Sequence, residues 1–324
     1  MESSLPVRRF DMLDAYRGIA ALAVLFYHAG AQAPLLAPRG YLGADLFFIL
    51  SGFVLAHAYG ARLAGGLGLS GFIRLRLIRI YPMFLMGAVL GALLFHGNPL
   101  MLLMLPTPSA DGLLFHANAP LWSVVFELLV SLGYCLLAPR LGLRGLLAIA
   151  GVTGLVLARG ILTHDGADLG AFAATAGLGL VRTAFCFTIG VLLHRAYLAR
   201  HRVPATGPLG LALPVVLVLV LMIDPAGRAW WDIATIGAIF PALIWLGACT
   251  ALPRPALGER LGGMSYPLYC IHAPIVAMCH GSARLMGLAC LALVALAQVL
   301  DRRFDRPLQR LARREPSPGR IASA

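Results

Sequence analysis

The fold is decided by LDAYRGIAALAVLFYHAG, residues 13–30, and GYLGADLFFILSGFVLAHAYG, residues 40–60. Both segments are apolar enough to lie in a membrane. They nevertheless contain polar and ionisable side chains, among them Asp14, Arg17, His28, Asp45 and Ser51. Each ionisable group at membrane depth costs about 2.5–3.5 kcal/mol on insertion scales. Several such groups in the first two spans therefore indicate chemistry or transport within the membrane.

Composition places the whole chain in a membrane. Of 324 residues, 60% are hydrophobic and only 12% are charged, and the mean hydropathy is +0.83. A soluble domain carries about 25% charged residues. The length suits roughly ten spans of about 20 residues with short loops, without room for a separate soluble domain.

Apolar runs between polar, Pro and Gly residues predict ten spans: 14–33, 41–60, 80–97, 120–138, 145–163, 172–193, 208–223, 233–252, 264–280 and 283–300. Each is expected to be helical, because backbone groups in lipid must bond internally and the runs lack the alternation of a barrel. The sequence thus predicts an all-α polytopic protein, with a transmembrane unit over 1–300 and a basic cytoplasmic tail over 301–324.

Arginine predicts the orientation. Twenty of the 26 basic residues fall in segments that share one side if the N-terminus is cytoplasmic, and the opposite loops hold only four. This bias predicts an even number of spans with both termini in the cytoplasm. The net charge of +12 then reflects membrane topology, and we expect no nucleic-acid partner.

Two kinds of chemistry are excluded. The chain has no lysine, so a lysine Schiff base or nucleophile is impossible. The six cysteines lie inside apolar runs, without a CxxC pair or a Cys/His spacing typical of metal ligands. We therefore expect no metal and no disulfide.

The first span carries one polar stripe. Arg17 and His28 are eleven residues apart, which returns to within about 20° of the same helix face with a rise of about 16 Å. Asp14 lies one turn before Arg17. A histidine near mid-membrane can act as a neutral base, or it can be a core histidine that hydrogen-bonds between helices.

Later segments add polar groups of the same kind. Asp45 can orient a histidine or neutralise an arginine of another span, and Ser51 can hydrogen-bond across the interface. Arg76 and Arg79, one turn apart, can grip phosphates or simply flank a span on the cytoplasmic side. Glu127 is expected to pair with an arginine or histidine of another span.

Two stripes complete the set. Ser123 shares a face with Glu127, and Ser265, Tyr269 and His272 share a face of the ninth predicted span. A second embedded histidine predicts a polar cavity shared by spans one, two, four and nine. A hydrogen-bonded core histidine is the alternative.

Five blocks of sequence together resemble the membrane-bound acyltransferase 3 family, of the type that O-acetylates bacterial polysaccharides and exopolysaccharides. They are LDAYRGIAALAVLFYH (13–28), GYLGADLFFILSGFVL (40–55), RLIRIYP (76–82), LWSVVFE (121–127) and MSYPLYCIH (264–272). They occur in the family's order and span most of the chain. The middle, about 140–255, carries no recognised motif.

The resemblance implies a bacterial inner-membrane enzyme that moves an acyl group, first of all acetyl, from acyl-CoA to a hydroxyl of an extracytoplasmic glycan or lipid-linked glycan precursor. Membrane lipids are the other partners, and no cofactor is tightly bound. Arg17 and His28 are needed for activity, with His28 as general base. Asp45 or Glu127 would hold its tautomer.

Arg76 and Arg79 would bind the donor's phosphates. Seven residues are expected to support the pocket: Asp14, Ser51, Trp122, Ser123, Ser265, Tyr269 and His272. Direct transfer is the first expectation, and an acyl-enzyme on serine or histidine is the second. From another class, a proton-coupled transporter of a solute or lipid-linked sugar would also use buried charges.

Overall fold

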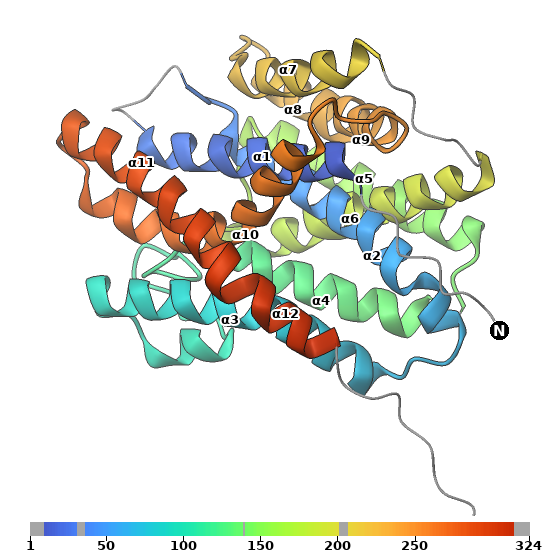
Figure 1. The fold of residues 1–324 in the computed structure, drawn as a ribbon, viewed down its shortest axis with the longest axis horizontal. Coiled ribbons are helices and arrows are strands. Elements are labelled where there is room, and N and C mark those ends of the chain that lie inside the picture. The colour runs from blue at the N-terminus through green and yellow to red at the C-terminus, as the bar shows by residue number, and fades with distance from the viewer. Residues whose placement is uncertain (1–9, 31–35, 139, 201–206, 314–324) are drawn as a thin grey trace, which may run out of the picture.

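The computed structural model describes residues 10–30, 36–138, 140–200 and 207–313. This part of the chain is helical and contains two isolated β-bridges but no strand (Figure 1). The all-α prediction is therefore confirmed. Residues 314–324 of the predicted tail lie outside the described residues.

Each predicted span corresponds to a helix. The α-helices are α1 (Asp11–Ala29), α2 (Gly43–Ala64), α3 (Leu69–Phe95), α4 (Leu121–Leu137), α5 (Leu143–His164), α6 (Ala176–Arg200), α7 (Leu209–Met222), α8 (Arg228–Ala234), α9 (Phe240–Ala248), α10 (Pro255–Met278), α11 (Ala283–Leu300) and α12 (Arg306–Arg313). Short 3-10 turns are η2 (Gly40–Leu42), η3 (Pro99–Leu103) and η4 (Ala173–Thr175). Two π-helical turns, η5 (Thr235–Ile239) and η6 (Asp301–Asp305), join α8 to α9 and α11 to α12.

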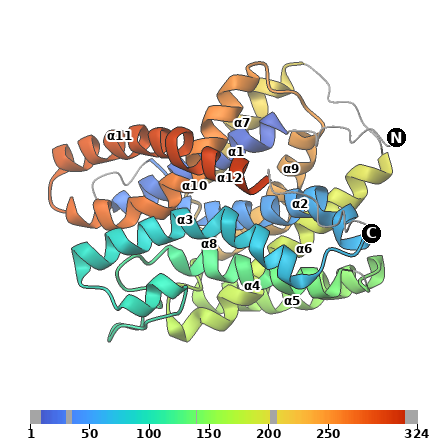
Figure 2. The ribbon, with the colours of Figure 1, turned by 60° about the horizontal axis from the view of Figure 1, so that its bottom comes forward.

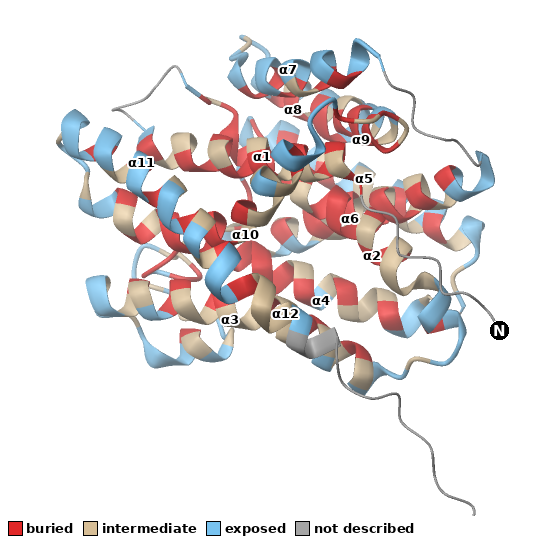
Figure 3. Cartoon of the chain, viewed as in Figure 1, coloured by how far each residue is buried: buried red, intermediate tan, exposed pale blue. Residues whose placement is uncertain are grey.

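Six helical runs among the described residues are long and apolar enough to cross a membrane. They are Gly40–Ala64, Leu69–Phe95, Leu143–His164, Ala173–Arg200, Arg228–Ala248 and Ala283–Arg310. Large apolar side chains cover their outward faces, as at Leu155 of α5 and Leu291 of α11, which are 75% and 72% exposed. The buried residues concentrate in the middle of the molecule (Figure 3). Apolar outer faces of this extent suit lipid contact, so the chain is a multi-pass membrane protein.

Helices α1, α10 and α3 lie side by side and run in the same direction (Figure 1). Gly262 of α10 packs on Asp14 near the start of α1, and His272 reaches His28 near its end. On the other side of α10, the Tyr266 hydroxyl donates to the Ile80 carbonyl at 2.6 Å. The first halves of the three helices therefore meet at one end of the bundle, and their last turns meet at the other end.

Helices α2 and α6 touch backbone to backbone. A Cβ on Gly52 would collide with the Phe187 carbonyl oxygen, and a Cβ on Gly190 would collide with the Ile49 carbonyl oxygen. Small residues permit such close packing of membrane helices. The two glycines thus set the distance at which polar groups of α2 and α6 meet.

Gly190→Ala is expected to lower the free energy of unfolding by about 1–3 kcal/mol, because the added methyl forces two backbones apart. Gly177→Ala on the same helix is the matched control, since a Cβ there meets nothing within 4 Å. Thermal unfolding in detergent checks both variants. Equal transition temperatures for them would contradict the close packing.

The predicted spans 80–97 and 264–280 begin too late. Helix α3 starts at Leu69 and α10 at Pro255. In α3, the arginines before residue 80 have carboxylate partners and stay in the helix. Arg76 pairs with Glu127, and Arg79 pairs with Asp305. At the other end of the chain, α11 continues through η6, where Asp301 and Asp305 are buried. Figure 2 shows α12 packed near α3.

Candidate active site

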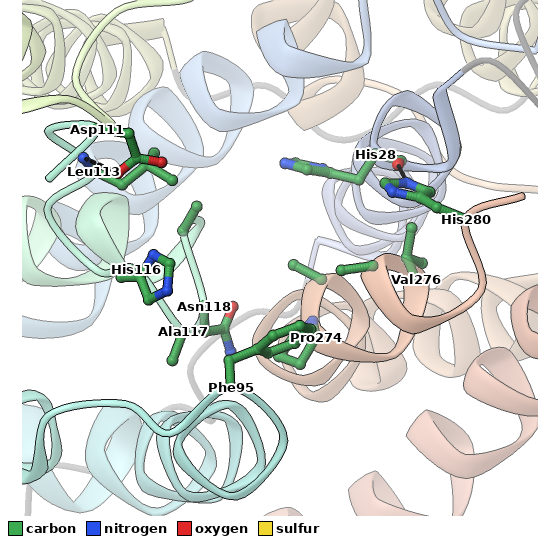
Figure 4. A pocket seen from close by; sticks show the side chains of 13 residues that line it. His28, Phe95, Asp111, Leu113, His116, Ala117, Asn118, Pro274, Val276 and His280 are labelled. Carbon is green, nitrogen blue, oxygen red and sulfur yellow. Dashed lines mark hydrogen bonds between the residues drawn. The ribbon is translucent and has the colours of Figure 1, made fainter. Parts of the chain in front are cut away.

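A cavity of about 280 Å³ lies where α1, α3 and α10 end, beneath the connection from α3 to α4 (Figure 4). We call it the histidine pocket. Its lining comprises His28, Phe95, Asp111, Leu113, His116, Ala117, Asn118, Ala119, Ala273, Pro274, Val276, Ala277 and His280. The predicted cavity of spans one, two, four and nine is thus partly wrong: spans one and nine contribute, but the other walls are the end of α3 and the loop before α4.

His28 extends into this pocket (Figure 4). It lies in the last turn of α1, which ends at Ala29, whereas the predicted first span runs to residue 33. Its Nδ1 is 2.9 Å from the Val24 carbonyl oxygen, an atom that only accepts hydrogen bonds. Nδ1 must therefore carry the proton, which leaves Nε2 as a free base.

His272 supports the same tautomer. Its own Nδ1 donates to the backbone carbonyls of Tyr269 at 2.8 Å and Leu268 at 3.1 Å. Its Nε2 is consequently an acceptor, and it lies 3.3 Å from His28 Nδ1. The group that orients His28 is therefore a neutral histidine and a backbone carbonyl, not the expected Asp45 or Glu127.

Asp45 faces α6 instead of His28. Its carboxylate accepts hydrogen bonds from Arg182 Nε at 2.6 Å and from Arg182 Nη2 at 2.5 Å. Both side chains are at most 1% exposed. Arg182 also donates to the carbonyls of Leu169 and Tyr41. Asp45 lies in the first turn of α2, on the face that packs on α6 at the glycine contact. Of the two alternatives for Asp45, neutralising an arginine is confirmed, and orienting His28 is wrong.

A second polar group, which we call the arginine cluster, lies nearer the starts of α1 and α3. It consists of Arg17, Arg76, Arg79, Glu127 and Ser51. Glu127 accepts from the Ser51 hydroxyl at 2.6 Å and from Arg76 at 2.7 Å, which confirms the expected pairing of Glu127 with an arginine. This contact also takes Ser51 and Glu127 away from the histidine pocket.

Arg17 completes the arginine cluster without a direct ion pair. It interacts electrostatically with Asp14, Arg79, Glu127 and Arg76, but no carboxylate of the described residues lies within 4 Å of its guanidinium. Arg79 is bound to Asp305 at 2.9 Å and its side chain is 35% exposed, whereas the Arg76 side chain is 9% exposed. Glu127 thus neutralises Arg76 and Asp305 neutralises Arg79, while Arg17 has Asp14 as a nearby negative charge.

The remaining predicted supporting residues are placed as follows. The hydroxyls of Tyr269 and Ser123 share a hydrogen bond of 2.6 Å, and both lie within reach of the Pro120 carbonyl, so these two hydroxyls join α10 to α4 beside His272. Ser265 donates to the Gly262 carbonyl of its own helix. Trp122 packs on the rings of Phe48 and Phe126, and none of the four lines the histidine pocket.

Sequence reasoning missed four polar residues of the pocket: Asp111, His116, Asn118 and His280. The first three lie in a loop, where no helical period marks them, and His280 follows the end of α10. Hydrogen bonds from Ser109 Oγ and the Leu113 N–H hold the pKa of the Asp111 carboxyl below its usual value. Asp111 is therefore charged at neutral pH. Within the described ranges, no group of three His, Cys, Asp or Glu side chains is arranged to hold a metal ion.

Comparison with known proteins identifies the family of the chain. A family model described as an acyltransferase domain matches residues 10–297. The chain is also 34% identical over 185 residues to "Protein 2 in picA locus" of Rhizobium radiobacter, covering 48% of this chain and 96% of that relative. No solved structure gives a significant match. The chain belongs to the acyltransferase 3 family and is a membrane acyltransferase.

Proposed function

We propose that this protein transfers an acetyl group from acetyl-CoA to a hydroxyl of an extracytoplasmic glycan or its lipid-linked precursor, with His28 as general base. It does so as a ten-span protein of the bacterial inner membrane, with both termini in the cytoplasm. One observation carries the proposal: His28 Nδ1 is committed to Val24 O and His272, and the ring extends into a pocket large enough for part of a sugar.

The reaction follows from that tautomer. Nε2 of His28 takes the proton of the acceptor hydroxyl, whose oxygen attacks the thioester carbonyl and forms the new ester bond. The carbon–sulfur bond breaks, and the leaving thiolate receives the proton from His28. While His28 is positively charged, its Nδ1–H faces two acceptors, Val24 O and His272 Nε2, and both stabilise the cation.

The arginine cluster would bind the donor. Coenzyme A carries several phosphate charges, and guanidinium groups match phosphate geometry. Arg17 and His28 are eleven residues apart on α1, a rise of about 16 Å. If Arg17 and Arg79 hold the phosphates, the pantetheine arm of coenzyme A would extend along α1 and reach the histidine pocket. Glu127 holds Arg76 in place and acts as a positioning residue.

Mass spectrometry of surface glycans tests the function. Cells that make the protein should carry an acetyl ester that is absent from cells without it and from cells with His28→Ala. Purified protein should release free CoA from acetyl-CoA in step with ester formation. A transporter would instead move its substrate unchanged, and an identical glycan mass in all three strains would contradict the proposal.

Arg79→Ala is expected to raise the KM for acetyl-CoA about 10-fold or more with a smaller change in kcat, because a charge-assisted contact to phosphate is worth about 1.5–3 kcal/mol. Arg74→Ala, an equal charge loss at an exposed position of α3, is the matched control. Steady-state kinetics with the purified protein measure both. A KM unchanged from that of Arg74→Ala would remove Arg79 from donor binding.

A further inference from the structure

Asn118 joins the two helices that flank the histidine pocket. Its side chain is 1% exposed, and its Nδ2 donates to the Cys270 carbonyl of α10 at 2.8 Å and to the Gly87 carbonyl of α3 at 3.0 Å. Both partners are carbonyl oxygens, which only accept hydrogen bonds. The two contacts therefore fix which atom of the amide is nitrogen and which is oxygen.

The amide oxygen is left over. Asn118 Oδ1 is buried and has no hydrogen-bond partner. Asn118 lines the histidine pocket, and Figure 4 shows its oxygen on the side of the cavity. Buried polar atoms in native proteins almost always have a partner, so an orphaned acceptor at a pocket wall calls for a donor that arrives with a ligand.

Other polar groups of the pocket also favour a ligand that donates hydrogen bonds. His28 Nε2 is an acceptor in the tautomer fixed by Val24 O. Asp111, on the opposite wall in Figure 4, carries a charged carboxylate. Three hydrogen-bond acceptors around one cavity suit a molecule with several O–H donors. A substrate with a single hydroxyl would satisfy only one of them.

We propose that Asn118 Oδ1 accepts a hydrogen bond from a second, non-reacting hydroxyl of the acceptor, which is therefore a polyol of the sugar class. The inference rests on the proposed function and deepens it. Asn118 holds the sugar by the hydroxyl that is not acylated and presents the neighbouring reactive hydroxyl to His28 Nε2. It is a specificity residue, and its rigid attachment to α3 and α10 gives it a fixed position.

Single-hydroxyl deletion in the substrate provides the test. The purified full-length protein is given acetyl-CoA and methyl glycosides of glucose, galactose, mannose and N-acetylglucosamine, and then the monodeoxy forms of each glycoside that is acetylated. For wild type, removing one non-reacting hydroxyl is expected to lower kcat/KM about 10- to 100-fold, the usual cost of an unmade hydrogen bond to a buried group. With the parent glycoside, Asn118→Ala is expected to lower kcat/KM by a similar factor. With that deoxy form, the kcat/KM of Asn118→Ala should fall no further.

Gly87→Ala is the matched structural control. A Cβ on Gly87 presses on the Cys270 carbonyl and on Asn118 Nδ2, so it disturbs the same helix junction and keeps the amide oxygen. It should retain the preference for the parent over the deoxy glycoside, although its total activity falls. This ratio does not depend on the fraction of folded protein, so partial unfolding of either variant does not obscure it.

Three outcomes overturn the proposal, and they are distinguishable. If Asn118→Ala keeps the wild-type ratio for every deoxy form, Asn118 only joins helices, and the proposed function stands. If the protein consumes acetyl-CoA but acetylates no glycoside, the polyol acceptor is wrong both here and in the proposed function. If acetyl-CoA is not consumed with any acceptor, the proposed donor fails as well.

Discussion

Replacing His28 by alanine is expected to lower acetyl transfer about 100- to 10,000-fold, the range that a general base contributes, with the protein still present in the membrane at its normal level. The histidine pocket would lose the ring whose Nε2 is left as a base because its Nδ1 contacts both Val24 O and His272. The side chain makes no ion pair among the described residues, so its loss should leave the fold intact.

His272→Ala is the informative companion. It removes one of two acceptors for His28 Nδ1–H and leaves Val24 O in place, so a loss of about 10-fold is expected, the size of one neutral hydrogen bond. Initial rates of purified proteins, matched by size-exclusion profile, measure both variants. A His28→Ala enzyme within 10-fold of wild type would show that another group removes the proton.

Replacing Arg182 by leucine is expected to be the most destabilising single change in the chain. It leaves the Asp45 carboxylate fully buried without its partner, which costs about 3–5 kcal/mol. Total stabilities are about 5–15 kcal/mol, so most of the protein should fail to reach the membrane in folded form. Levels of folded protein by size exclusion, and thermal unfolding in detergent, measure the effect.

Two matched variants separate the ion pair from the mere loss of an arginine. Arg195→Leu removes a charge from the same helix and breaks only a bond to the Leu141 carbonyl, so it should be mild. Asp45→Leu combined with Arg182→Leu removes both charges and should recover much of the lost stability, since well-packed apolar pairs replace buried ion pairs at little cost. If Arg182→Leu were as stable as Arg195→Leu, the pair would be unimportant for the fold.

Hydropathy predicted α1 to α11 of the described residues, because each apolar run had to become helical in lipid, but it did not predict α12, which lies in the segment expected to be a tail. It placed the starts of α3 and α10 too late, and in α3 the reason is that a hydropathy scale scores Arg76 and Arg79 as loop residues. Their partners Glu127 and Asp305 are distant in sequence, and only the folded chain shows that these charges are neutralised inside the bundle.

The candidate site also contains residues that the sequence predicted and residues that it missed. The helical period brought Arg17 and His28 onto one stripe and suggested a second histidine nearby, and the structure places His272 beside His28. The partner of Asp45 was missed, because Arg182 lies in a region without a recognised motif. Asn118 was missed because a loop has no period, and an unpaired amide oxygen becomes visible only when its neighbours are known.

The pair of Asp45 and Arg182 also orders events during synthesis. The two residues are 137 positions apart, and translation adds about 5–20 residues per second, so Asp45 exists for about 7–27 s before Arg182 is made. Throughout that interval Asp45 lacks its partner Arg182, and α2 contains a carboxyl group that lipid disfavours. The buried ion pair between α2 and α6 can therefore form only after the first 182 residues have been synthesised.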